Sequence, residues 1–152
     1  MTDIAMVYQM LNWKAPSTIQ AQGKELARKV KDLSLLIQPP AEPSVWEQCA
    51  AILSEKTDTQ LEPYLTELLQ WLQDLNWPGA VTIAERLKTF SGEKLKKPFE
   101  DAVNQSKKMD RHEGSMWQDY LSELLDNREL VPLLSDDVTA LLKQHYHNWG
   151  NW

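Results

Sequence analysis

Residues 61–75 read LEPYLTELLQWLQDL, and this stretch carries the clearest structural signal in the chain. Its apolar residues are spaced three or four apart, as in an amphipathic α-helix, at positions 61, 64, 65, 68, 69, 72 and 75. Pro63 falls in the first turn, where a missing N–H costs little. Asn76 and Pro78 predict the start of a second helix near residues 80–87, with Asn76 as its N-cap. We expect two tightly joined helices, with Leu68 at the centre of the buried face of the first.

The rest of the sequence also favours helices. It contains 22 Leu against 12 Val and Ile together, and β-branched side chains lose rotamer freedom in a helix whereas leucine does not. Capping boxes at Ser44 with Glu47 and at Ser115 with Gln118 indicate two helix starts. The prolines of 38–43 predict a stiff connector, and the polar residues 105–114 a loop. Further helices are expected at about 3–12, 15–31, 44–55, 93–104, 115–126 and 135–146, with a short turn near 33–37.

Two short motifs recur in the same order. Leu-Asn-Trp at 11–13 recurs at 75–77, and Ser-Val-Trp-Glu at 44–47 recurs as Ser-Met-Trp-Gln at 115–118. The tryptophans at 13, 46, 77 and 117 would then open the second helices of successive helical pairs. We interpret residues 1–152 as one helical-repeat domain with halves 1–60 and 61–152, an all-α, short right-handed α–α superhelix of about seven to nine helices. Chance recurrence of the motifs is the alternative.

The run PYLTELLQWLQDLNWP, residues 63–78, resembles a family of small bacterial proteins known as domain of unknown function 5071. The resemblance extends over about residues 61–142 and includes Ala-Glu-Arg-Leu at 84–87 and Met-Trp at 116–117, whereas residues 1–58 match less well. It implies a fold of HEAT-like helical pairs. Because it implies no catalytic residues to carry over, it bears on the architecture and not on the chemistry.

The composition narrows the range of partners. The net charge is -6 and the sequence pI is about 5.1, which argues against nucleic acid because a duplex repels an acidic domain. No apolar run approaches the roughly 20 residues of a membrane-spanning helix, and the N-terminus lacks a signal pattern. We therefore expect a cytoplasmic protein with no membrane contact.

The sequence lacks the residue groupings that catalysis needs. The five glycines are scattered singly, which excludes a glycine-rich phosphate loop. Cys49, the single cysteine, lies among apolar residues of a predicted helix, where a thiol is usually a packing group. We expect a non-catalytic protein with no cofactor and no metal site.

Charge is segregated along the chain. Residues 55–74 carry five acids and one base, residues 119–137 six acids and one base, and residues 86–111 eight bases and four acids. Solvated helix faces are one explanation, and a surface for a partner of complementary charge is the other. We select Glu62, Glu67 and Asp74 as candidate partner-binding residues. Trp71 joins them because it lies off the leucine stripe, as either edge packing or an exposed aromatic anchor.

These observations lead to three functional hypotheses. The first is a non-catalytic protein-binding module that meets a basic protein partner, in its most specific form an immunity-type protein neutralising a basic toxin. The second is an enzyme or enzyme subunit that holds a small ligand in an acidic groove with Asp74 or Glu85. The third is binding of a nucleic-acid backbone through the basic segment 86–111.

Overall fold

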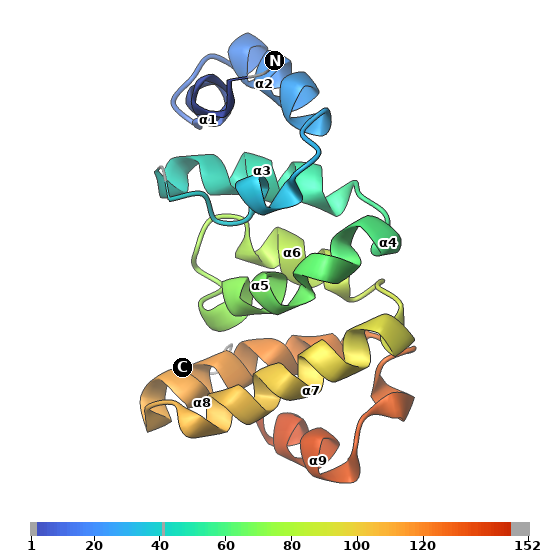
Figure 1. Ribbon diagram of the computed structural model, residues 1–152. Helices are drawn as coiled ribbons and strands as arrows, with labels where there is room; N and C mark the ends of the chain where they lie inside the picture. Colours follow the sequence, from blue (N-terminus) through green and yellow to red (C-terminus); the bar gives the residue numbers. More distant parts are fainter. Residues whose placement is uncertain (1–2, 41, 147–152) are drawn as a thin grey trace.

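The computed structural model describes residues 3–40 and 42–146. Within these residues all regular structure is helical, and the helices form one elongated stack (Figure 1). The all-α class is confirmed, with a number of α-helices in the expected range. The α-helices are α1 (Ile4–Leu11), α2 (Ser17–Arg28), α3 (Trp46–Ser54), α4 (Asp58–Leu61), α5 (Leu65–Gln70), α6 (Ala80–Leu87), α7 (Gly92–Lys108), α8 (Arg111–Leu121) and α9 (Asp136–His145).

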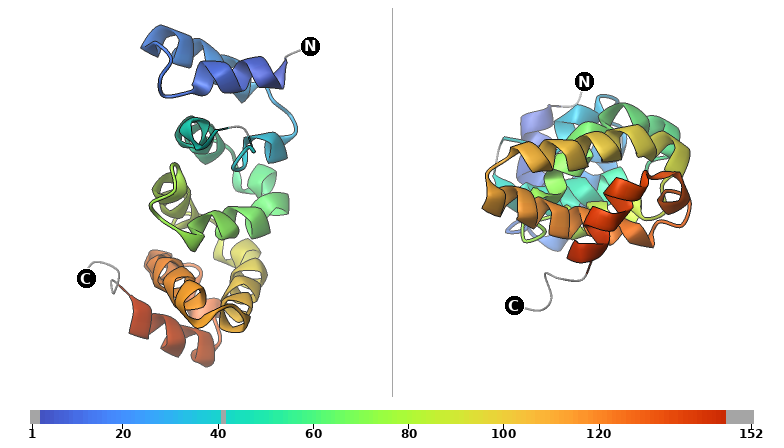
Figure 2. Two further views of the ribbon diagram at one scale, coloured as in Figure 1. Left: turned by 90° about the vertical axis from the view of Figure 1, so that its left-hand side faces the viewer. Right: turned by 90° about the horizontal axis from the view of Figure 1, so that it is seen from below.

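The stack consists of layers that pack one on the next (Figures 1 and 2). α1 lies beside α2, α2 packs on α3, α3 on α6 and α5 on α7, while α8 lies beside α7 and carries α9 at the far end. One core runs through the layers, from Val7 in α1 to Leu142 in α9. The proposed boundary between residues 60 and 61 falls inside α4. The right-handed twist, the HEAT-like character and the duplication stay predictions.

Residues 61–73 are helical, but they do not form one straight helix, and Asp74 and Leu75 lie beyond the last helical turn. α4 ends at Leu61, a 3₁₀ turn covers Glu62–Tyr64, and after α5 a second 3₁₀ turn covers Trp71–Gln73. Pro63 lies in the first of these turns, where the tighter winding needs no N–H from it. The expected apolar face is nevertheless buried, with Leu68 only 1% exposed and buried in the same core as Leu61, Leu65, Leu69 and Leu72.

The prediction of a loop at residues 105–114 is wrong. α7 continues to Lys108 and α8 begins at Arg111, so only two residues separate the helices. Residues 105, 107 and 108, whose polarity suggested a loop, lie on the exposed face of α7. Val103 and Ser106 are buried on its inner face. The polar stretch is therefore the solvent side of an amphipathic helix.

Three predicted helix caps are also wrong. Ser115 lies inside α8, whose N-cap is Asp110. Gly79, with a φ of 85°, takes the N-cap position of α6 that we assigned to Asn76. Ser44 lies in a 3₁₀ turn before α3, which has no side-chain cap.

The four tryptophans do not occupy equivalent places. Trp13 lies in the turn between α1 and α2 and is 54% exposed, and Trp77 lies half-buried in the turn before α6. Trp46 is the first residue of α3. Trp117 lies inside α8, fully buried, and donates its indole N–H to the Leu69 carbonyl oxygen at 3.1 Å. The expectation that all four open second helices is therefore wrong.

Three carboxylates each accept a hydrogen bond from the start of a helix farther along the stack. Glu47 accepts from Gly79 N at 2.6 Å, Asp58 from Ser91 N at 2.9 Å, and Glu100 from Ser135 N at 3.0 Å. These N–H groups belong to helix starts, where intrahelical acceptors are missing and negative charge is favoured. Burial raises the pKa of Asp58, but hydrogen bonds from Arg86 and Ser91 outweigh it and hold that pKa below its ordinary value.

Replacing Gly114 by alanine is expected to destabilise the protein by about 1 to 3 kcal/mol, through overpacking. An added Cβ would lie far inside contact distance of the Ser106 carbonyl oxygen of α7. In an unobstructed helix the same change stabilises by roughly 1 kcal/mol, so the sign of the effect in urea unfolding is diagnostic. Ser115→Ala, at an exposed position of α8, is the control and should change stability by less than about 0.5 kcal/mol. A more stable Gly114→Ala variant would contradict the close approach.

Candidate functional site

The segregated charges of the sequence meet each other across the layers. Arg28 pairs with Glu55 at 2.9 Å, Arg86 with Asp58 at 2.6 Å and Lys94 with Glu62 at 3.3 Å. Five of the eight bases in 86–111 form ion pairs, namely Arg86, Lys88, Lys94, Lys96 and Lys97. Arg86, Lys88 and Lys94 pair with acids of other elements, whereas Lys96 and Lys97 pair along α7 itself. The basic segment therefore presents less free charge to a nucleic-acid backbone than its composition suggested.

The interpretation of Trp71 as an exposed anchor is wrong. Its side chain is fully buried, and its indole N–H donates to the Pro78 carbonyl oxygen at 3.0 Å. Its ring packs edge-on against Trp46, with centroids 6.2 Å apart. The position of Trp71 off the leucine stripe assumes a straight helix, but the chain tightens into a 3₁₀ turn at this residue. Both α6 and α8 pack on that turn.

The three candidate acids have different surroundings. Glu62 is ion-paired with Lys94 in the turn before α5, and Glu67 is exposed on α5 itself. Asp74 follows the second 3₁₀ turn, half-buried, and accepts from Asn76 N at 2.8 Å. Asp74 also lines a cavity.

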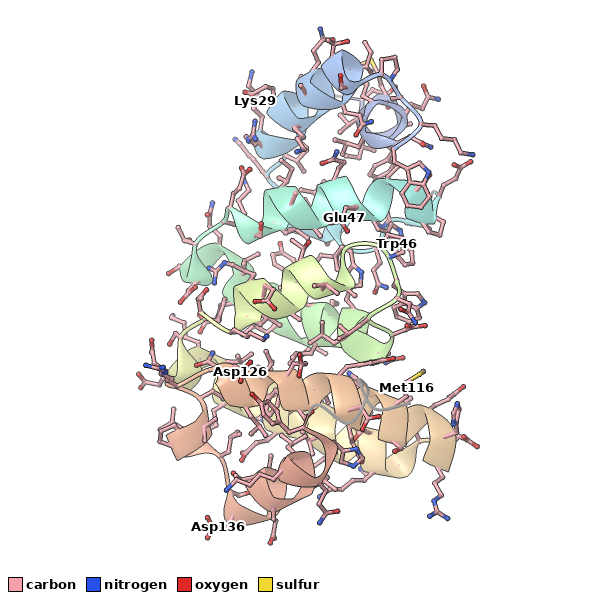
Figure 3. The ribbon with its side chains drawn as sticks, turned by 180° about the vertical axis from the view of Figure 1, so that it is seen from behind. Lys29, Trp46, Glu47, Met116, Asp126 and Asp136 are labelled. Atoms are coloured by element: carbon pink, nitrogen blue, oxygen red, sulfur yellow. The ribbon has the colours of Figure 1, made fainter. Side chains whose placement is uncertain are left out.

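That cavity, which we call the Trp77 pocket, lies between two turns of neighbouring layers. It has a volume of about 150 Å³ and is lined by Gln73, Asp74, Trp77, Met109, Glu113 and Met116. The first three residues come from the turn before α6, and the others from the end of α7 and from α8. Figure 3 shows Met116 at the edge of the stack that also carries Trp46.

The Trp77 ring forms the aromatic wall of the pocket, and Trp46 supports it. Trp46 packs edge-on against Trp77, with ring centroids 6.2 Å apart and planes at 84°. Trp46 is itself fixed by the hydrogen bond from its indole N–H to the Pro39 carbonyl oxygen, at 2.9 Å. Edge-to-face contacts of this kind orient rings as well as bury them, so the Trp77 ring is positioned before any ligand arrives.

The lining chemistry suits one cationic side chain. Two carboxylates, Asp74 and Glu113, stand beside an indole and two thioethers, and none of the lining residues is a lysine or arginine. Aromatic faces attract cations, and methionine adapts to the aliphatic stem of a long side chain. At about 150 Å³ the pocket is below the range of roughly 300 to 1,000 Å³ for small-molecule sites. It therefore matches the size of a protruding side chain better than that of a cofactor.

Comparison with protein families assigns the chain. A family model described as Domain of unknown function (DUF5071) matches residues 47–152. The chain belongs to the DUF5071 family. The match begins earlier and ends later than the expected 61–142, and it contains every residue of the Trp77 pocket, whereas α1 and α2 lie outside it. No curated protein and no solved structure matches the chain.

The pocket of this DUF5071 chain could not be predicted from the sequence. The sequence predicts that Trp77 lies at a helix start and that Met109 and Glu113 lie in a loop. No pattern in the sequence connects residues 73–77 with residues 109–116, because only the stacking of layers brings the two turns together. Asp74 was selected for its charge alone.

Cys49 has the environment of a packing group. It is fully buried in α3, and desolvation raises the pKa of its thiol to about 12. Among residues 3–40 and 42–146, no cluster of three or more His, Cys, Asp or Glu side chains could hold a metal ion. In the same residues no helix has the length and apolarity needed to cross a bilayer.

Cys49 is expected to resist alkylation in the folded protein. A thiol with a pKa of about 12 provides very little thiolate at pH 8, and the thiolate is the reactive form. Iodoacetamide labelling followed by mass spectrometry should give negligible modification in native buffer and complete modification in denaturant. Rapid native labelling would contradict the buried position.

Proposed function

We propose that the protein is a cytoplasmic, non-catalytic binding module that holds a lysine or arginine of a basic protein partner in the Trp77 pocket. The observation that carries the proposal is the pairing of Asp74 and Glu113 with the Trp77 ring in a cavity the size of one side chain. A net charge of -6 adds a general attraction for a basic partner.

The two kinds of lining group have separate roles in this proposal. Carboxylates at the rim of an interface mainly raise the association rate, whereas a buried aromatic contact mainly slows dissociation. Trp77 thus takes the anchor role that we first gave to Trp71. Lys108 and Arg111 flank the same turn and are exposed, but they do not line the pocket.

A more specific form of the proposal is an immunity-type protein that neutralises a basic toxin. The net negative charge of the chain supports it. The enzyme alternative has less support, because Glu85 is ion-paired with Lys88 at 3.0 Å and does not line the pocket with Asp74.

Co-purification of tagged variants from the native host tests the proposal. A basic protein should be retained by the wild type, and retention should fall strongly for Trp77→Ala and for the volume-conserving pair Asp74→Asn with Glu113→Gln. The matched control is Glu93→Gln with Glu129→Gln, which removes the same charge from exposed acids. Both control residues lie at the other end of α7, since Gly92 packs against the Glu129 backbone. That end is roughly 24 Å from the pocket at 1.5 Å per helical residue.

Melting temperatures of the variants separate a binding defect from unfolding. Retention of the same basic protein by folded Trp77→Ala, or equal loss in the control pair, would contradict the proposal.

A further inference from the structure

A second and larger cavity lies where the end of α2 meets α4 and the 3₁₀ turn after it. Its volume is about 460 Å³, within the range of roughly 300 to 1,000 Å³ that is usual for small-molecule sites. Lys29, which lines it, lies at the opposite edge of the stack from Trp46 and Met116 (Figure 3). We call it the Lys31 groove.

The Lys31 groove is cationic. Arg28, Lys29, Lys31 and Lys56 line it, and no carboxylate does. Two of the four are engaged: Arg28 pairs with Glu25 and Glu55, and Lys56 Nζ donates to the Arg28 carbonyl oxygen at 3.0 Å. Lys29 and Lys31 are exposed and form no ion pair within the part of the chain that the structure describes. They leave two ammonium groups for an external anion.

Neutral donors line the same groove. Gln60 Oε1 accepts from Thr57 N at 2.9 Å in the capping box of α4, which fixes the amide and leaves its NH₂ group as a donor. The Thr59 hydroxyl and the Tyr64 phenol also line the cavity. Donors without competing carboxylates favour a ligand rich in acceptor oxygens, as a phosphate group is.

The remaining wall is apolar. Pro63 and the half-buried Tyr64 ring form one side, and Val30 and Leu33 contribute to the lining. An inorganic ion would leave this wall uncovered, whereas a flat ring attached to the anionic group would bury it.

We propose that the Lys31 groove binds a small molecule that carries a phosphate group on an aromatic ring system. The phosphate contacts Lys29 and Lys31, and the ring lies against Pro63 and Tyr64. This site is independent of the proposed partner-binding function, because it lies on the opposite edge of the stack and has the opposite charge.

Calorimetric titration of the full chain with phenyl phosphate and with adenosine monophosphate tests the proposal at low ionic strength. Both should bind more tightly than inorganic phosphate, and phenol and adenosine should give no detectable binding. Backbone amide signals of residues 29–31, 59–62 and 64 should shift on addition of either phosphate ester. Lys29→Gln with Lys31→Gln should weaken binding by about tenfold or more, since each charge-assisted hydrogen bond is worth this order of magnitude.

The control variant is Lys107→Gln with Lys108→Gln, which removes the same charge from exposed residues at the end of α7. All four lysines are exposed, so both variants should keep the wild-type melting temperature. Absence of binding by both esters, affinities no higher than that of inorganic phosphate, or equal weakening in the two variants would overturn the proposal.

Discussion

Replacing Trp71 by alanine is expected to lower the free energy of unfolding by about 3 to 5 kcal/mol, the range for truncating a buried aromatic side chain. The ring is fully buried, its indole N–H bonds the Pro78 carbonyl oxygen at 3.0 Å, and Trp46 packs on it edge-on. The substitution leaves a cavity between the layers and removes the hydrogen bond to the partly buried Pro78 carbonyl. Urea unfolding followed by circular dichroism measures the change.

Trp13→Ala is the matched control, because the same side chain is 54% exposed there. It should change the free energy of unfolding by less than about 0.5 kcal/mol. Similar stabilities of the two variants would mean that Trp71 is not a core residue.

Replacing Asn127 by alanine is expected to cost about 2 to 4 kcal/mol, because it removes four side-chain hydrogen bonds, three of them buried. Asn127 is 1% exposed, and its amide nitrogen donates to the carbonyl oxygens of Leu87 at 2.8 Å and Phe90 at 3.0 Å. Its side-chain oxygen accepts from Glu129 N and Leu130 N, both at 3.0 Å. One side chain therefore joins the end of α6 to the segment between α8 and α9.

Asn127→Asp tests the donor role of the side chain separately from its acceptor role in the same urea unfolding experiment. The aspartate keeps the acceptor for Glu129 and Leu130 but places a buried charge beside two carbonyl oxygens, so at pH 7 it should be at least as unstable as the alanine variant. Asn76→Ala, at an exposed asparagine, should be close to the wild type. A loss below about 0.5 kcal/mol for Asn127→Ala would contradict the bridging role.

Most of the fold could be predicted from apolar spacing. Burial of an amphipathic helix depends on its own sequence pattern, so Leu68 was correctly placed in the core. The sequence pattern gave wrong predictions where contacts between elements determine the local structure. Polar residues near 105 suggested a loop, although α7 needs only one buried face to remain helical. Asn76 suggested a cap, although Glu47 of the preceding layer supplies the acceptor for Gly79 N.

Less of the candidate site could be predicted from the sequence. Glu62 was selected from a run of acids, but its partner Lys94 lies 32 positions away in the next layer. Charge segregation along the chain thus reflects pairing between layers as much as a binding surface. Trp71 and Trp77 lie in neighbouring turns, and only the packing of α6 and α8 decides which ring is covered.

The claim that the Trp77 pocket holds a cationic side chain of a protein partner is tested most directly by the dissociation rate of the co-purified partner. Surface plasmon resonance with folded Trp77→Ala should show dissociation about thirtyfold faster than for the wild type, which corresponds to a loss of about 2 kcal/mol. Asp74→Asn with Glu113→Gln should mainly slow association and flatten its salt dependence. An unchanged dissociation rate for folded Trp77→Ala would contradict the claim.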